Sequence, residues 1–143
     1  MFDPSSPVST IMSVDVHHVS PTDILTSVVA LIASHGVHHL PVCENGKVVG
    51  MLSQYDLNRL EHSFTIFGTA ESKSFNADII DSLIVKDVMT KEVATIQADA
   101  TIQTAADIFK SSSFHSLVVV EADGKTLKGI LTVMDLVHYA YAN

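Results

Sequence analysis

Two short segments carry the side chains best suited to chemistry, Gly50–Asp56 and Gly129–Asp135. Both contain a glycine, two apolar residues, a hydroxyl residue, two variable residues and an aspartate. In one interpretation the hydroxyl of Ser53 or Thr132 caps a helix, and the carboxylate three residues later bonds the capping amide. In the other, the helix N-terminus presents unpaired amides to an anion, and the carboxylate accepts bonds from two sugar hydroxyls. Taken singly, each segment favours simple helix capping, with a ribose-phosphate site as the functional alternative.

These segments belong to an internal repeat, which must position them. Residues of the first half recur 77 positions later, as Met12 and Met89 or His38 and His115 show, and from Gly50 and Gly129 onward they recur 79 positions later. The change of register falls in a polar turn, where insertions are tolerated. A motif that appears twice in the same context favours the binding interpretation over capping alone.

Each copy has the periodicity of a strand, a helix, two strands and a final helix. In the first copy we expect a strand Val14–Val19, a helix capped by Ser20 and ended by Gly36, and strands Val37–Cys43 and Lys47–Leu52 forming an antiparallel hairpin through Asn45-Gly46. In the second we expect a strand Val93–Ile96, a helix Thr101–Ser112 capped by Asp99, strands Phe114–Val120 and Leu127–Thr132, and a helix near Asp135.

The expected architecture is α/β (α+β), with repeat 1 at residues 1–63, a linker at 64–82 and repeat 2 at 83–143. A strand-helix-strand connection is nearly always right-handed, so each repeat should form a small sheet with helices on one face. A unit of about 60 residues buries little surface by itself. We therefore expect the two copies to pack together.

Composition excludes several classes of partner. Lys and Arg total 8 against 16 Asp and Glu, giving a net charge of −8. Nucleic acid and anionic membrane surfaces both require clustered cations, so neither is expected as a partner. The chain has no apolar run of the roughly 20 residues that a spanning helix needs. The N-terminus lacks the features of a secretory signal, which favours a cytoplasmic location.

Catalysis and metal binding are not expected. Of the eight histidines, none stands in a familiar ligand spacing with Cys, Asp or Glu, so no metal site is predicted. Cys43, the single cysteine, lies in an apolar run typical of a buried thiol. A hydrolase or redox enzyme that uses Cys43 and nearby histidines stays as a minor alternative.

The chain resembles a known family, the cystathionine-β-synthase-type (CBS) domain pair, or Bateman module. The resemblance rests on Ile11-Met12-Ser13 and Asp87-Val88-Met89-Thr90, on Gly36–Val42 and Gly46–Gly50, and on the two segments that end in Asp56 and Asp135. It implies tandem repeats related by pseudo-two-fold symmetry, with two clefts that bind adenosine compounds. It also implies a homodimer through the helices, with Val137, Tyr139 and Tyr141 as candidate contributors.

The resemblance also assigns candidate ligand-binding residues in two sets. One consists of Asp135, Thr132 and Ile130 with Val16, His17, Val37, His38 and His39; the other consists of Asp56, Ser53 and Met51 with Val93, Ala94, Phe114, His115 and Ser116. Many nucleotide-binding members have His-Arg where this chain has His38-His39 and His115-Ser116. Since imidazole or serine is a weaker phosphate ligand than an arginine fork, this departure bears on how phosphate is held.

We therefore expect a stand-alone regulatory module, not an enzyme, that requires no cofactor. Its ligand would be an adenine nucleotide (AMP, ADP or ATP) or S-adenosylmethionine, and its macromolecular partners would be a second copy and an unidentified regulated protein. The alternative is a structural dimerisation module whose clefts bind nothing and whose Ser53/Asp56 and Thr132/Asp135 are capping boxes only.

Overall fold

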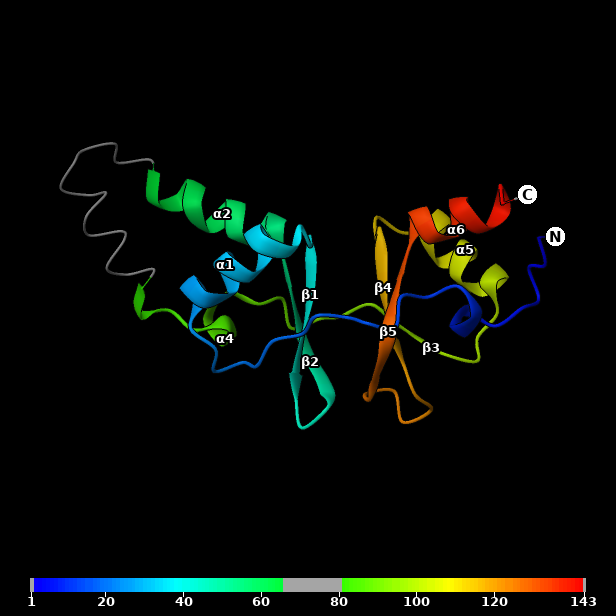
Figure 1. The fold of residues 1–143 in the computed structure, drawn as a ribbon, viewed down its shortest axis with the longest axis horizontal. Coiled ribbons are helices and arrows are strands. Elements are labelled where there is room, and N and C mark those ends of the chain that lie inside the picture. The colour runs from blue at the N-terminus through cyan, green and yellow to red at the C-terminus, as the bar shows by residue number, and fades with distance from the viewer. Residues whose placement is uncertain (1, 66–80, 143) are drawn as a thin grey trace. The chain divides into compact units, whose positions relative to one another are not determined.

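The computed structural model describes residues 2–65 and 81–142. The chain divides into two compact units, and each takes residues from both repeats. The first-repeat unit is His17–Glu92, and the second-repeat unit combines Met1–Val16 with Val93–Asn143. Each unit is described by itself below, with the element labels of Figure 1. Most of the expected linker, residues 66–80, lies outside the described residues.

The first-repeat unit packs its helices against a two-stranded sheet. Its elements are α1 (Leu25–His35), β1 (His39–Glu44), β2 (Lys47–Ser53), α2 (Gln54–Thr65) and α4 (Val85–Val88). The strands are antiparallel, and Asn45 and Gly46 connect them with φ of 55° and 79°. Positive φ at both turn residues matches the twist of the flanking strands, so the predicted Asn-Gly hairpin is confirmed. Gly36, in the left-handed conformation, ends α1 as expected.

The second-repeat unit has the same plan with a third strand. It contains the 3-10 helix η1 (Val8–Thr10), β3 (Thr95–Gln97), α5 (Ile102–Ser111), β4 (Ser116–Val120), β5 (Leu127–Thr132) and α6 (Val133–Ala140). β4 pairs with β3 in parallel and with β5 in antiparallel orientation. In the first-repeat unit a single parallel bridge between Val19 and Val42 stands where β3 pairs with β4. The mixed α+β class and the repeated order of elements are as expected.

The segment that opens each repeat pairs with the last strand of the other repeat. Ser13 exchanges two backbone hydrogen bonds with Ile130 of β5, and Thr90 does the same with Met51 of β2. Gly129 and Gly50 stand one residue before these bridges and leave room for them. A Cβ on Gly129 would lie 2.5 Å from the Ser13 carbonyl oxygen, and one on Gly50 would lie 2.5 Å from Met89 Sδ. Close backbone approach therefore explains both glycines.

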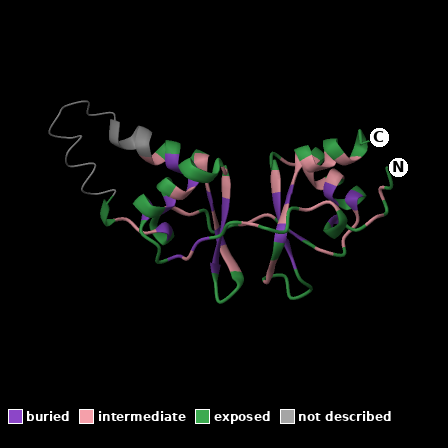
Figure 2. Ribbon diagram, viewed as in Figure 1, coloured by how far each residue is buried: buried purple, intermediate pink, exposed green. Residues whose placement is uncertain are grey.

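Apolar side chains form one core in each unit. In Figure 2 the buried positions follow the strands and the inner turns of the helices. Leu40 and Leu52 of the paired strands contact Leu25 and Val28 of α1 in the first core. The second core has the same layout and includes Leu117, Leu131, Ile102 and Ala105. Burying side chains of this kind contributes about 1.5–3 kcal/mol each, so these cores hold the helices that begin at Ser53 and Thr132.

Three predictions about local structure are wrong. Residues 14–18 are not a strand, because Ser13 pairs with Ile130 and Val19 with Val42 while the chain passes from one unit to the other between them. Ser20 does not cap α1: its amide bonds the Asp23 carboxylate in a turn, and the helix begins after Ile24, which pairs with Ile84. Thr101, rather than Asp99, caps α5 by accepting a hydrogen bond from the Thr104 amide at 3.1 Å.

Candidate functional site

Asp56 occupies the first turn of α2, and its side chain is only 5% exposed. Its Oδ2 accepts hydrogen bonds from the Ser53 amide at 2.9 Å and the Ser53 hydroxyl at 3.0 Å. Ser53 Oγ lies 3.2 Å from the Asp56 amide, which completes a reciprocal cap. The predicted helix cap is therefore present in this segment. It uses the carboxylate oxygen Oδ2, so the other oxygen, Oδ1, can contact other residues.

Oδ1 of Asp56 faces residues from two further parts of the first-repeat unit. The Thr90 hydroxyl donates to it at 3.2 Å, and Nη2 of Arg59 lies 3.5 Å away. A hollow beside this carboxylate is lined by Asp56, Arg59, Leu60, Asp87 and Val88. We call Ser53, Asp56, Arg59 and Thr90 the Asp56 half-site. It joins a carboxylate, two hydroxyls and a guanidinium, which are groups that hold sugar hydroxyls and anions.

Asp135 has the matching position in α6 of the second-repeat unit. Its Oδ2 accepts a bond from the Thr132 amide at 2.8 Å, and the Thr132 hydroxyl accepts one from the Asp135 amide at 3.1 Å. Asp135 is half-buried, and Ser13 stands in the chain where Thr90 stands for Asp56. We call Ser13, Thr132 and Asp135 the Asp135 half-site. The two half-sites share the reciprocal cap and differ in the residues around the carboxylate.

The residues expected to approach phosphate flank the hydroxyls. His39 pairs with Ser53 across the β1–β2 ladder, and Ser116 pairs with Thr132 across β4–β5. Directly paired residues on antiparallel strands have Cβ atoms about 4.5–5.5 Å apart, so each is a neighbour of its hydroxyl. The carbonyl of His38 accepts a bond from the Gln54 amide, and that of His115 accepts one from the Val133 amide. Both histidines therefore lie against the first residue of a capped helix.

The other predicted site residues are distributed over both units. Met51 and Ile130 make the backbone bridges already described, and the Ala94 carbonyl accepts a bond from the Val118 amide. Phe114 is 48% exposed, and the ring of His17 lies against that of His35 with centroids 4.4 Å apart. Val16 and Val93 are half-buried in the second-repeat unit, and Val37 packs against the core of the first. The expected pairing of these residues with the aspartate of the other repeat stays a prediction.

Sequence reasoning missed Thr90 and Arg59, which contact the Asp56 carboxylate, and Ser13, which pairs with Ile130. A signal for Thr90 and Ser13 was present, because both end the motifs that open the repeats and correspond under the 77-residue offset. Their nearness to the other repeat's segment depends on the exchange of opening segments, which periodicity does not reveal. Arg59 stands one helical turn after Asp56, and side chains at that spacing share a helix face.

The alternatives based on metals and on Cys43 gain nothing from the structure. Among residues 2–65 and 81–142, no group of three or more His, Cys, Asp or Glu side chains is arranged to hold a metal ion. Burial raises the pKa of the Cys43 thiol, which lowers the fraction of reactive thiolate at neutral pH. None of the helices in the described part of the chain is long and apolar enough to cross a membrane.

The duplicated unit, the exchanged opening segments and the two capped aspartates define a class of paired α+β modules with one half-site per repeat. A CBS domain family model matches residues 8–63 and 85–142. The chain belongs to the CBS domain family.

The similar proteins include plant, archaeal and bacterial chains. The chain is 30% identical over 142 residues to the CBS domain-containing protein CBSX1, chloroplastic, of Arabidopsis thaliana, and covers 59% of it. It aligns with CBSX2 crystallised in complex with AMP at a TM-score of 0.76 and 28% identity, covering 94% of this chain and 96% of that one. Protein MJ1225 of Methanocaldococcus jannaschii aligns at a TM-score of 0.83 with 24% identity, covering 97% of this chain and 49% of that one, which supports the fold.

The chain spans at most about three fifths of the curated relatives named here. Its match to inosine-5'-monophosphate dehydrogenase of Korarchaeum cryptofilum is 30% identical but covers only 22% of that enzyme. The similarity to this enzyme is therefore confined to a minor part of its chain.

Proposed function

We propose that this chain is a regulatory module, without catalytic activity of its own, that binds an adenine nucleotide or another adenosyl compound through the Asp56 and Asp135 half-sites. The observation that carries the proposal is the AMP complex of CBSX2, a protein that aligns with nearly the whole of this chain. The local geometry supports it, because each half-site offers a carboxylate and a hydroxyl at a helix N-terminus. AMP is the first ligand to test, followed by ADP, ATP and S-adenosylmethionine.

Binding at the Asp56 half-site would exchange hydrogen bonds. In the free protein Oδ1 of Asp56 accepts from the Thr90 hydroxyl, and Oδ2 accepts from Ser53. The two hydroxyls of a ribose can take the place of the hydroxyl donors, while the Ser53 amide keeps the carboxylate on the cap. The released hydroxyls of Ser53 and Thr90, and His39 next to Ser53, can then donate to the ligand. A ligand of this kind regulates only if it binds two arrangements of the protein with different affinity.

A thermal melt tests the proposal. We expect saturating AMP to raise the melting midpoint, since a ligand at 100 times its Kd stabilises the native state by about 2.7 kcal/mol. The variants Asp56→Asn and Asp135→Asn keep a side-chain oxygen for the cap but lose the carboxylate charge. Each should remove binding at its own half-site, and the double variant should remove the whole rise. An AMP-induced rise that persists in the double variant, or no rise with any adenosyl compound in the unaltered protein, contradicts the proposal.

The structural alternative rests on a different feature, the apolar helix faces. A groove between α1 and α2 is lined by Leu25, Val29, Ile32, Ala33, Gln54, Leu57 and Leu60, and one between α5 and α6 by residues that include Ile102, Ala106, Leu136 and Val137. Val29 and Val137 are 43% and 39% exposed. Tyr139, which is also expected at a dimer contact, packs on Phe2 within the chain, and its hydroxyl accepts a bond from the Asp3 amide. We propose that these grooves are covered by a second copy of the chain, with or without ligand.

Light scattering tests the homodimer. We expect a dimer mass, and we expect Val29→Glu and Val137→Glu to shift the protein towards the monomer because each places a charge on an apolar contact surface. Val14→Glu is the matched control, since Val14 is 63% exposed and lines neither groove. A monomer at all concentrations in the unaltered protein, or equal effects of all three substitutions, rejects this interface.

Two further expectations, on the location in the cell and on a regulated protein, remain predictions. The first is the cytoplasmic location, and the relatives CBSX1 and CBSX2 are named as chloroplastic proteins. The second is the regulated protein partner that the family leads us to expect.

A further inference from the structure

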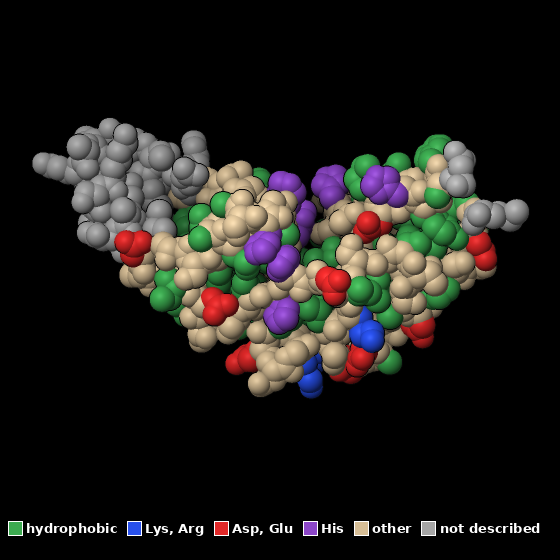
Figure 3. Space-filling model, viewed as in Figure 1, with side chains coloured by type: hydrophobic (Ala, Val, Ile, Leu, Met, Phe, Trp, Pro, Cys, Tyr) green, Lys and Arg blue, Asp and Glu red, His purple; other side chains and the backbone are tan. Residues whose placement is uncertain are grey.

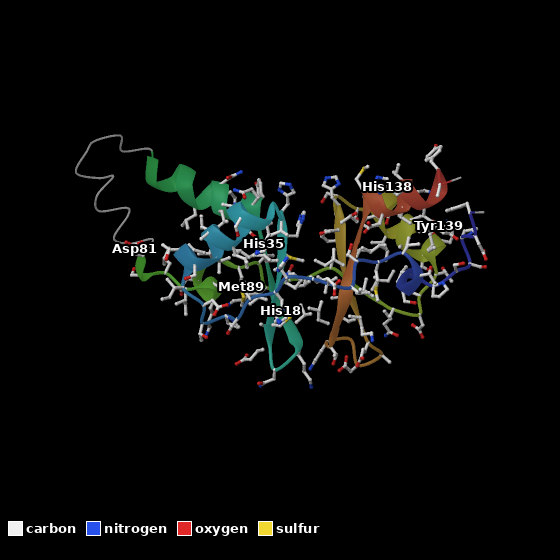
Figure 4. All side chains as sticks on the ribbon, in the orientation of Figure 1. His18, His35, Asp81, Met89, His138 and Tyr139 are labelled. Atoms are coloured by element: carbon white, nitrogen blue, oxygen red, sulfur yellow. The ribbon has the colours of Figure 1, made fainter. Side chains whose placement is uncertain are left out.

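The two half-sites differ at the position three residues after each aspartate. Arg59 stands there in α2, and His138 stands there in α6, where Figure 4 labels it. A guanidinium is permanently charged and forms forked bonds with anions, whereas an imidazole offers single N–H donors and no fork. The repeat that makes the half-sites alike therefore gives only one of them a permanent positive charge.

The hollow beside Asp56 makes that charge important. Its lining includes the carboxylates of Asp56 and Asp87, and Arg59 is the basic residue among the residues that line it. The chain as a whole is also acidic: it carries a net charge of −8, and Figure 3 shows acidic side chains scattered over the visible face with few basic ones. A phosphate that enters this hollow meets two negative charges, which Arg59 must offset for binding to be favourable.

Arg59 is placed to do so. Its Nη2 lies 3.5 Å from Asp56 Oδ1, its guanidinium lies 5.3 Å from the centroid of the Tyr55 ring, and its side chain is 61% exposed. Because Arg59 is exposed to solvent, which screens its charge, its contact with the buried Asp56 contributes little to stability, and turning Arg59 towards a ligand costs little. The long side chain can thus turn from Asp56 to an anionic group while the carboxylate holds the sugar.

We infer that Arg59 is a specificity-determining residue that makes the Asp56 half-site select phosphorylated adenosine compounds over uncharged ones, while the Asp135 half-site discriminates less. This inference rests on the proposed function. The inference assigns the preference for negatively charged ligands to repeat 1. It also assigns this preference to a helix residue, Arg59, and not to the strand positions of His39 and Ser116.

The test compares AMP with adenosine by calorimetric titration in a protein that has one working half-site. Asp135→Asn provides the background, and Arg59→Gln is added to it. We expect the ratio of adenosine Kd to AMP Kd to fall about tenfold, equivalent to 1.4 kcal/mol, with adenosine affinity almost unchanged. Arg59→Lys should keep part of the ratio, and Lys110→Gln, which removes an exposed charge on α5, should leave it unchanged.

Each outcome has a distinct meaning. An equal loss of AMP and adenosine affinity in Arg59→Gln overturns the inference, because Arg59 would then contact the base or the fold instead of the phosphate. An unchanged ratio, or an equal fall in Lys110→Gln, overturns it as well. If neither AMP nor adenosine binds the unaltered protein, the inference fails, and if ADP, ATP and S-adenosylmethionine do not bind it either, the proposed function fails as well. Circular dichroism of each variant checks that the fold is intact.

Discussion

Replacing Gly129 by Ala will destabilise the protein by about 2–3 kcal/mol, as expected when an atom is forced into a packed position. The new Cβ would lie 2.5 Å from the Ser13 carbonyl oxygen, and that oxygen accepts the backbone bond from Ile130. Since a backbone carbonyl cannot rotate away, the opening segment of repeat 1 must move off β5. The substitution therefore weakens both hydrogen bonds between Ser13 and Ile130.

Gly50→Ala is the matched control. Its new Cβ meets the Sδ of Met89 at 2.5 Å, and the Thr90 carbonyl oxygen only at 3.1 Å. A methionine side chain is flexible, so we expect a smaller loss of about 1 kcal/mol. Urea unfolding measures both variants, and hydrogen exchange should show faster exchange of the Ile130 amide in Gly129→Ala. A Gly129→Ala protein as stable as the unaltered chain would show that the close approach at Ser13 does not hold in solution.

Replacing Asp56 by Ala will destabilise the ligand-free protein by about 2 kcal/mol, because it removes a buried carboxylate that accepts three hydrogen bonds. The Ser53 amide and hydroxyl lose Oδ2, and the Thr90 hydroxyl loses Oδ1. The contact with Arg59 adds little to this figure, because that side chain is 61% exposed. The expected effect is that of a helix cap together with a contact between two parts of the chain.

Asp135→Ala is the comparison for this prediction. Asp135 caps α6 through the Thr132 amide, so its removal should cost about 1 kcal/mol, as is typical of a cap. Thermal or urea unfolding without ligand measures both variants. Equal losses would mean that the Thr90 contact contributes nothing, and the stability of Thr90→Val would then match that of the unaltered protein.

The Asn45-Gly46 hairpin and the two hydroxyl-aspartate caps could be predicted because their signals are local. Asn45-Gly46 favours positive φ at both residues, and the structure has it; Thr132 and Asp135 three residues apart predict a capping box, and both of its bonds are present. The strand Leu127–Thr132 has the expected bounds. In each case the residues that decide the conformation are neighbours in the chain.

Two of the three wrong predictions have the opposite cause. Val14–Val19 has the composition of a strand, but a strand needs a continuous ladder with one neighbour, and the β-bridges here join Ser13 to Ile130 and Val19 to Val42 in different units. Ser20 and Asp23 have the composition of a helix cap, but they form a turn whose neighbour Ile24 pairs with Ile84. Pairing with a distant segment overrode the local preference at both places.

The sequence alone determined the duplicated α+β plan, the family and the two hydroxyl-aspartate segments. Repetition and short-range backbone preferences depend only on residue types and their spacing. Tertiary structure decided which segments meet: it placed Thr90 and Arg59 on Asp56, and Ser13 on β5. The physical reason is that the opening segments satisfy their backbone hydrogen bonds on the other repeat, and only the folded chain determines which distant groups come within bonding distance.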